Sequence, residues 1–116
     1  MDYFHNQEIP VIIKTYDLYK LYYGYLELFP KKDKYALGKK CEEQIIELLE
    51  LILTAKSAPP DRKKTATSKA SVKLDMLKIF IRLGQDLKLL DRKKYLAIEN
   101  HLQEIGRMIG GWQKSI

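Results

Sequence analysis

The amino-acid sequence predicts an all-α protein, an antiparallel up-down-up-down four-helix bundle. Four stretches carry apolar residues that recur every three or four positions, which is the period of a helix face. No stretch alternates strictly between apolar and polar residues, so no strand is needed to account for any part of the chain. The 116 residues fit one domain, expected to span 1–116, and a domain of this size buries a self-sufficient core without metals or disulfides.

The first helix is expected at about 10–29. Pro10 is tolerated near a helix start, where its missing N–H has no partner to lose, whereas Pro30 cannot continue the helix. The connection that follows is short, so the second helix must run antiparallel beside the first. The core face of the first helix is expected to carry Ile12, Thr15, Tyr19, Tyr22, Leu26 and Phe29.

The second helix is expected at about 34–57, with Asp33 as its N-cap and Pro59 beyond its end. Cys41 is the only cysteine, so it cannot form a disulfide within the chain. A place in the core and a reducing compartment are therefore expected for it. The core face repeats at heptad spacing and carries Cys41, Ile45, Leu48, Ile52 and Ala55.

The third helix is expected at about 62–90. The sequence does not decide where between Asp61 and Ser68 this helix begins. The connection there is rich in Ser, Thr and Lys, which predicts a frayed first turn. The face assigned to the core carries Val72, Met76, Phe80, Leu83, Leu87 and Leu90. A second apolar row consists of Leu74, Leu77 and Ile81, and the second helix has a similar one at Ile46, Leu49 and Leu53. These rows either widen the core face or form contacts between subunits.

The fourth helix is expected at about 92–112, after Asp91 as a good N-cap residue. Glycine costs roughly 1 kcal/mol per helical position relative to alanine. Gly106 is therefore expected to mark the close approach of a neighbouring backbone, and Gly110 and Gly111 to end the helix or reshape its last turn. Trp112 should cover the end of the bundle. The core face carries Tyr95, Ile98, Leu102, Ile105, Ile109 and Trp112.

Positive charge is concentrated in the middle of the chain. The net charge is +6, and residues 56–94 carry twelve Lys and Arg against four Asp, a local balance of +8. Such a concentration attracts polyanions, and a solvated lysine face is the alternative. Lys78 and Arg82 lie one helical turn apart and, measured from the predicted core face, point outward. The candidate nucleic-acid or protein contacts are Lys78, Arg82, Arg62, Lys63, Lys64, Lys69, Lys73, Arg92, Lys93 and Lys94.

The sequence shows no constellation that predicts catalysis, a cofactor or a metal. His101 lies beside an apolar stripe, where exposure or a simple hydrogen bond is expected. Glu42, Glu43, Glu47 and Glu50 recur at helical spacing, but a di-iron bundle needs Glu-x-x-His pairs, which the chain lacks. No apolar run approaches the ~18 residues that cross a bilayer, and no secretion signal is evident. We expect a soluble, cytoplasmic protein that is not an enzyme.

Three runs of the sequence resemble the accessory variability determinant family of diversity-generating retroelements. The most specific is the closing run at 104–112, with three glycines and the only tryptophan. The corner Phe29-Pro30-Lys31 and the run Tyr35-Ala36-Leu37-Gly38 support it. The family consists of homopentameric barrels of four-helix bundles with a basic exterior.

The resemblance implies that the chain binds a reverse transcriptase and its template RNA, with DNA as a further candidate ligand. By the same resemblance, the chain is expected to possess no catalytic activity of its own and to support mutagenic retrohoming. It also implies that Lys78 and Arg82 carry the polyanion or polymerase contact. The corner after Phe29 carries lysines where relatives tend to use arginine. Lysine keeps the positive charge but lacks the planar guanidinium group that binds a phosphate through two hydrogen bonds. Two alternatives stay open: a four-helix protein of the 23S rRNA intervening-sequence type, with a structural or RNA-associated role, and a metal-carboxylate bundle enzyme.

Overall fold

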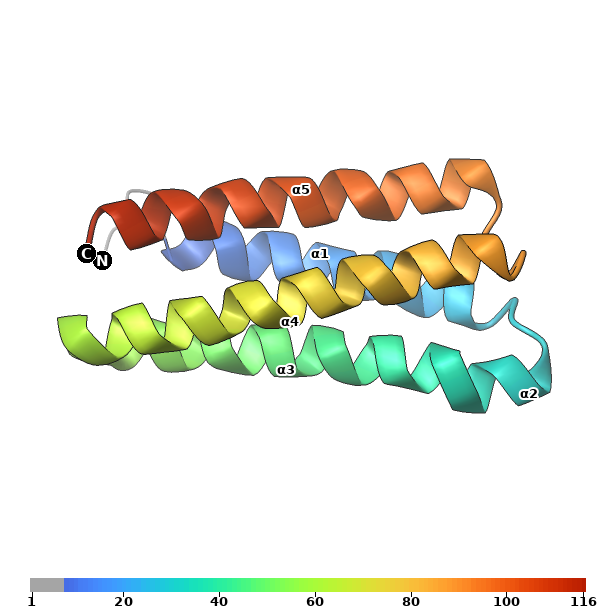
Figure 1. The fold of residues 1–116 in the computed structure, drawn as a ribbon, viewed down its shortest axis with the longest axis horizontal. Helices are drawn as coiled ribbons and strands as arrows, with labels where there is room; N and C mark the ends of the chain where they lie inside the picture. The colour runs from blue at the N-terminus through green and yellow to red at the C-terminus, as the bar shows by residue number, and fades with distance from the viewer. Residues whose placement is uncertain (1–7) are drawn as a thin grey trace.

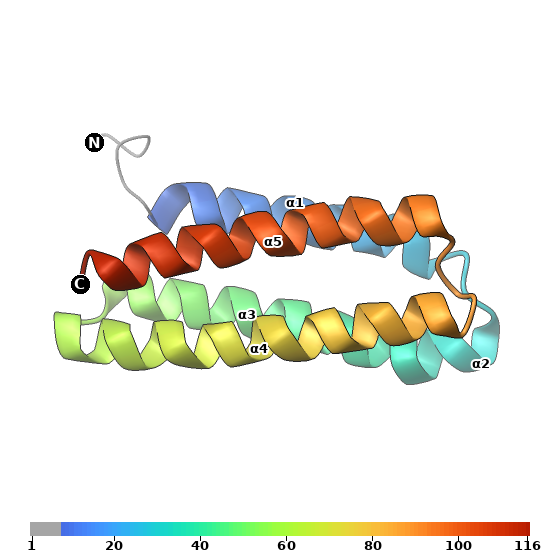
Figure 2. The ribbon, with the colours of Figure 1, turned by 45° about the horizontal axis from the view of Figure 1, so that its top comes forward.

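A computed structural model describes residues 8–116, in which four long helices lie side by side in a bundle of 43 × 23 × 20 Å (Figure 1). Residues 1–7, the start of the expected domain, lie outside the described residues. Within 8–116 the chain is all-α, and successive long helices run antiparallel, each beside the next (Figure 2). The elements are α1 (Glu8–Leu26), α2 (Lys31–Asp33), the π-helical turn η2 (Lys34–Gly38), α3 (Lys39–Ser57), α4 (Pro60–Asp86) and α5 (Arg92–Lys114).

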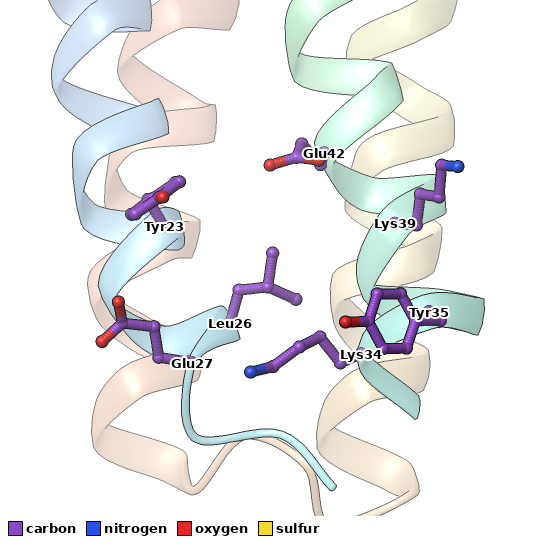
Figure 3. A pocket seen from close by; sticks show the side chains of 7 residues that line it. All are labelled: Tyr23, Leu26, Glu27, Lys34, Tyr35, Lys39 and Glu42. Carbon is purple, nitrogen blue, oxygen red and sulfur yellow. The ribbon is translucent and has the colours of Figure 1, made fainter. Parts of the chain in front are cut away.

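The corner between α1 and α3 is a continuous helical segment that widens into the π-turn η2 (Figure 3). The second helix therefore begins at Lys31 after Pro30, and the expectation that Asp33 is its N-cap was wrong. The Tyr22 hydroxyl donates a 2.7 Å hydrogen bond to the carbonyl oxygen of Gly38, deep in the bundle. A Cβ at Gly38 would lie 2.5 Å from Leu26 Cδ1 and 3.1 Å from the carbonyl oxygen of Asp33. Only glycine lets α1 and the π-turn approach this closely.

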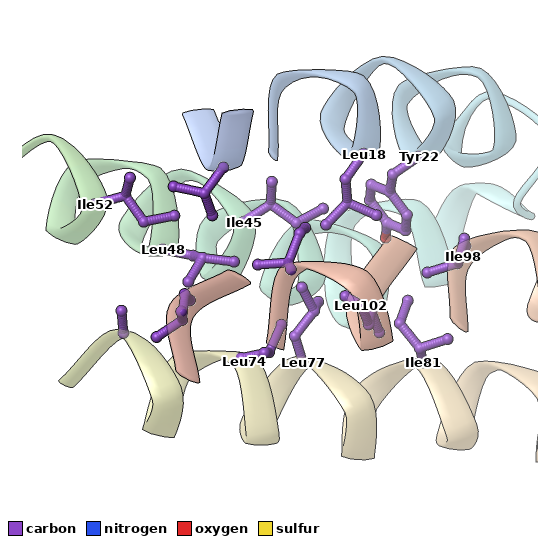
Figure 4. Close-up of a cluster of buried hydrophobic side chains, with 14 of the residues drawn as sticks. Leu18, Tyr22, Ile45, Leu48, Ile52, Leu74, Leu77, Ile81, Ile98 and Leu102 are labelled. Carbon is purple, nitrogen blue, oxygen red and sulfur yellow. The ribbon is translucent and has the colours of Figure 1, made fainter. Parts of the chain in front are cut away.

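The core is a single cluster of apolar side chains drawn from all four long helices (Figure 4). The faces predicted for α3 and α5 are confirmed, because every residue of the α3 row is buried and only Tyr95 of the α5 row is partly exposed. On α1 the buried face is turned slightly from the predicted one, so that Val11 and Leu18 are buried while Ile12 and Tyr19 lie at its edge. Cys41 is buried as expected, and burial raises the pKa of its thiol to about 11.

The core face predicted for α4 was wrong at Val72, Met76, Leu83 and Leu87, which are exposed, whereas Leu90 is buried as predicted and Phe80 packs partly buried against the core. Leu74, Leu77 and Ile81 are buried, whereas Val72 and Leu87 are more than half exposed. Both rows are apolar, so hydrophobic periodicity does not distinguish them. The row that faces the core continues through the small residues Ala66, Ala70 and Gly84, which let α4 pack closely against its neighbours. Of the two alternatives left open for Leu74, Leu77 and Ile81, a wider core face is confirmed, and a contact between subunits is excluded by their burial.

The ends of two helices also differ from the expected ones. α1 ends at Leu26 rather than near Phe29, because the amides of Leu28 and Phe29 bond back to carbonyls only three residues earlier, as in a turn. α4 begins at Pro60, where a proline at the first helical position loses no hydrogen bond, so the expected fraying before Ser68 is absent. α4 ends at Asp86, which leaves Leu87 and Leu90 outside the helix.

The glycines of α5 do not end the helix, contrary to expectation, since α5 continues through Gly110 and Gly111 to Lys114 without a positive φ at any glycine. A Cβ at Gly110 or Gly111 would meet no atom within 4 Å. At Gly106 it would lie 3.3 Å from Leu74 Cδ2, so the close neighbour is a side chain of α4 rather than the expected backbone. Gly106 alone of these three glycines is packed against another helix.

Replacing Gly106 with leucine should therefore destabilise the bundle by about 1–3 kcal/mol, because the added side chain overpacks the contact with Leu74. The matched variant Gly110→Leu should be neutral or stabilising, because its new side chain enters open space and leucine is the better helix former. Thermal unfolding of both variants at one protein concentration measures the difference. Equal melting temperatures for the two variants would contradict the packing role of Gly106.

Candidate nucleic-acid interface

Two lysine-rich segments that are far apart in the sequence meet at one end of the bundle. Residues 31–40 form the corner between α1 and α3, and residues 88–93 form the turn between α4 and α5, at the same end (Figures 1 and 2). The side chain of Lys94, next to the second segment, packs over the end of α1, because its ammonium lies 5.8 Å from the ring centre of Tyr25. We name this surface the basic end, and it comprises Lys31, Lys32, Lys34, Lys39, Lys40, Lys88, Arg92 and Lys93.

The α4–α5 turn is held by hydrogen bonds that close the end of α4. The amide of Leu89 donates to the carbonyl of Gly84 and that of Lys88 to Gln85, which is the Schellman pattern. Lys88 occupies the left-handed position of this motif with φ of 62°, where glycine is usual and a side chain costs about 1–2 kcal/mol. The chain thus keeps an exposed positive charge at a position where glycine would be more stable.

The start of α5 is capped as the sequence predicts. The Asp91 carboxylate accepts a 2.8 Å hydrogen bond from the backbone amide of Lys94, and its other oxygen lies 3.3 Å from the Lys94 ammonium. The backbone hydrogen bond, with help from the two neighbouring lysines, lowers the pKa of Asp91. Lys94 is therefore engaged in holding the turn, while Arg92 and Lys93 beside it are exposed.

The ten basic residues predicted as candidate contacts do not form one patch. Arg62, Lys64 and Lys69 are exposed near the start of α4, at the opposite end of the bundle from the basic end. At 1.5 Å per residue, Arg62 lies about 30 Å along α4 from Arg82. Charge that is clustered in the sequence is therefore spread along the length of a helix, and only Arg92 and Lys93 of the ten belong to the basic end.

Besides Lys94, two more of the ten predicted residues make contacts that stabilise the bundle itself. The Lys63 ammonium donates hydrogen bonds of 2.9 Å to the carbonyl of Ala55 and 2.8 Å to that of Lys56, at the end of α3. It also lies 5.9 Å from the ring centre of Trp112. The Lys73 ammonium lies 2.8 Å from Glu47 Oε2 on α3. These contacts join helices to one another, so neither ammonium group is fully available to bind a ligand.

Lys78 and Arg82 lie along α4 between the two ends. Lys78 follows the buried Leu77 and is half-buried, so it lies nearer the core than the predicted helical face implied. Arg82 is exposed, and its Nε donates to Asp86 Oδ1 at 3.3 Å. The hydrogen bond and the charge of Asp86 raise the pKa of Arg82. Of the pair, Arg82 presents the more accessible charge.

The lysines of the corner were recognised from the sequence as a basic surface, but they were not included among the ten predicted contacts. Residues 31–40 contain five lysines against one aspartate, but the broader balance outside 56–94 is negative and masked them. Their exposure could not be read from the sequence, because it depends on the π-turn. In the structure Lys31, Lys32, Lys39 and Lys40 are exposed, and Lys34 is half-buried.

A row of exposed apolar side chains runs along the outer face of α4, opposite its core face. We name it the α4 ridge, and it comprises Val72, Met76, Ile79, Leu83 and Leu87. Val72 is 61% exposed and Ile79 is 62% exposed. Soluble proteins rarely expose a continuous apolar row of this length unless it meets a partner.

Within 8–116 no three His, Cys, Asp or Glu side chains gather closely enough to hold a metal ion. His101 Nδ1 lies 3.0 Å from the carbonyl oxygen of Ala97, one turn earlier on α5, as expected for a simple hydrogen bond. None of the helices described here combines the length and the hydropathy that a membrane crossing requires.

These features define a class: a small all-α bundle with a basic end and an exposed apolar ridge. The model of the bAvd-like family matches residues 11–116, which is nearly the whole chain. The chain therefore belongs to the bAvd-like family, and the resemblance to the accessory variability determinant proteins is confirmed. No curated protein matches the sequence.

Proposed function

We propose that this protein is a non-enzymatic accessory protein of a diversity-generating retroelement. It acts in the cytoplasm, binds the reverse transcriptase of the same element together with the template RNA, and so supports mutagenic retrohoming. One observation carries the proposal: in a member of the bAvd-like family, two lysine-rich segments converge on one end of the bundle. Such a surface binds the phosphate backbone of a nucleic acid by releasing its counterions.

The experiment that tests this function is co-purification. The tagged protein is expressed with the reverse transcriptase encoded beside it, with and without the template RNA. We expect the polymerase to be retained on the tagged protein, and the RNA to be retained by the pair. Loss of the polymerase after ribonuclease treatment would show that RNA bridges the two proteins, whereas no retention in either condition would refute the proposal.

We also propose that the protein assembles as a homopentamer and that the α4 ridge forms the contact between subunits. A ring of identical subunits uses two different faces of each subunit. The α4 ridge supplies one apolar face, and the exposed side chains of Ile46 and Leu53 on α3 supply another. A groove of about 700 Å³ runs beside this α3 row, between α3 and the first turn of α4. Repetition around a ring would present the basic end several times to one RNA, which raises avidity.

Ile79→Glu should convert the assembly to single subunits, because a carboxylate would be buried without a partner at the centre of the contact. Helicity should not change, since Ile79 is exposed in the subunit. The matched control is Ile13→Glu, the same substitution at an exposed position of α1, which should assemble like the wild type. Multi-angle light scattering reports the mass of each variant. A wild-type protein that is monomeric at working concentration, or an Ile79→Glu variant that still assembles, would contradict the proposed contact.

A further inference from the structure

A pocket of about 410 Å³ lies at the corner of the bundle, between the end of α1 and the π-turn (Figure 3). Leu26 lies between its two walls, and the remaining side chains come from α1 on one side and from η2 and α3 on the other. The pocket adjoins the basic end, because Lys34 and Lys39 belong to both. Its lining is Tyr23, Leu26, Glu27, Lys34, Tyr35, Lys39 and Glu42.

The two tyrosines of the pocket are exposed, although tyrosine is a large side chain that a small bundle could bury. Tyr35 is 69% exposed and Tyr23 is 56% exposed. Tyr23 is supported from behind by Tyr19, with ring centres 6.3 Å apart, and the Tyr19 hydroxyl donates to Glu42 Oε2 at 3.1 Å. Aromatic faces that are open to solvent are platforms on which unpaired bases stack.

The π-turn accounts for the arrangement of the two lysines. In a π-helix the backbone hydrogen bond joins residues five apart, so the backbones of residues 34 and 39 lie about one turn apart. The Lys34 side chain points toward α1, whereas the Lys39 side chain points away from it at the edge of the pocket (Figure 3). In an α-helix the same two residues would be about 140° apart. Gly38 and its contacts with α1 keep the turn in this form, and the Lys34 ammonium extends from it toward α1 and Glu27 (Figure 3).

The charges of the pocket select among possible ligands. Glu27 and Glu42 would repel a free anion such as sulfate, while Lys34 and Lys39 would repel a lone cation. A nucleotide can satisfy both the two lysines and the two glutamates. Its negative phosphate is attracted by the lysines, and the amino group of its base and its ribose hydroxyl can donate hydrogen bonds to the glutamates. A flat ring also matches the aromatic and aliphatic side chains of Tyr35, Tyr23 and Leu26.

We propose that this corner pocket binds one unpaired nucleotide of a single-stranded RNA. The base stacks on Tyr35, with Tyr23 across the pocket. The neighbouring phosphate lies near Lys34, the charge of Lys39 at the edge of the pocket adds to the attraction, and the carboxylates of Glu27 and Glu42 accept hydrogen bonds from the base or ribose. The inference rests on the proposed function in taking RNA as the ligand, and it adds a subsite that distinguishes unpaired from paired RNA.

The test compares Tyr35→Ser with Tyr35→Phe in the full chain. The probes are a short single-stranded RNA and a fully paired duplex of the same length, measured by fluorescence anisotropy. We expect Tyr35→Ser to weaken single-strand binding by about 10-fold, since one stacked base is lost, and to leave duplex binding unchanged. Tyr35→Phe keeps the ring and should bind like the wild type. Circular dichroism checks that both variants are folded, as expected for so exposed a side chain.

The outcomes separate this inference from the proposed function. If neutralising the basic end weakens RNA binding but Tyr35→Ser binds the single strand like the wild type, the pocket is not a nucleotide site and the proposed function stands. If Tyr35→Ser loses the reverse transcriptase but not RNA, the pocket binds protein and the inference is overturned. Wild-type protein that binds neither RNA probe would overturn the inference together with the RNA part of the proposed function.

Discussion

Trp112→Ala is expected to lower the free energy of unfolding by about 3–5 kcal/mol, the usual cost of emptying a buried tryptophan site. Trp112 is only 4% exposed and lies near the end of α5, where few other large side chains could fill the space. The Lys63 ammonium lies over its ring and bonds the last carbonyls of α3. The substitution therefore removes buried apolar surface and one support of the lysine that joins α3 to α4.

Chemical denaturation at a fixed protein concentration measures this effect. Fixed concentration matters because assembly adds to the apparent stability. The control is Leu96→Ala, which removes an apolar side chain that is 42% exposed on the same helix and should change stability by less than about 1 kcal/mol. A Trp112→Ala variant that unfolds at the same denaturant concentration as Leu96→Ala would show that Trp112 does not close the bundle.

Neutralising four charges at the basic end should abolish most RNA binding. The variant replaces Lys31, Lys32, Arg92 and Lys93 with glutamine, all of which are exposed and not part of the core. If each contacts a phosphate of single-stranded RNA, the slope of log affinity against log salt should become shallower by about 3. Anisotropy titrations over a salt series give both the affinity and the slope.

The matched control carries the same change in net charge at the other end of the bundle. It replaces Arg62, Lys64, Lys69 and Lys114 with glutamine, which are also exposed. We expect it to bind RNA more tightly than the basic-end variant and to keep a salt slope close to that of the wild type. Equal losses in the two variants would mean that net charge, and not the convergence of two segments, governs binding.

The same RNA-binding titrations test Lys78 and Arg82, the two contacts that the family resemblance implied. Reversing the charges of Lys78 and Arg82 should weaken RNA or polymerase binding less than the basic-end variant does. The reason is that Lys78 is half-buried and Arg82 already bonds Asp86. Unchanged binding across the salt series would remove the pair from the interface altogether.

Hydrophobic periodicity predicts the helices and core of this bundle better than it predicts the residues of the binding site. The core rows of α3 and α5 were predicted correctly because each recurs regularly along its helix, although α3 carries a second, shorter row at Ile46, Leu49 and Leu53. Asp91 was predicted as a cap because capping needs only residues close in the sequence. In contrast, Lys63 and Lys73 were predicted as surface contacts, and their bonds to α3 could not be read from α4 alone.

The sequence by itself determined the number and approximate positions of the long helices and the core faces of α3 and α5. The physical reason is that the longest apolar row of each of these two helices is the row removed from water. Only the tertiary structure decided which apolar row of α4 is buried, since the choice depends on close packing at Ala66, Ala70 and Gly84. It also decided that residues 31–40 and 88–93 share one end of the bundle, because the path of the chain brings charges together irrespective of their spacing in the sequence.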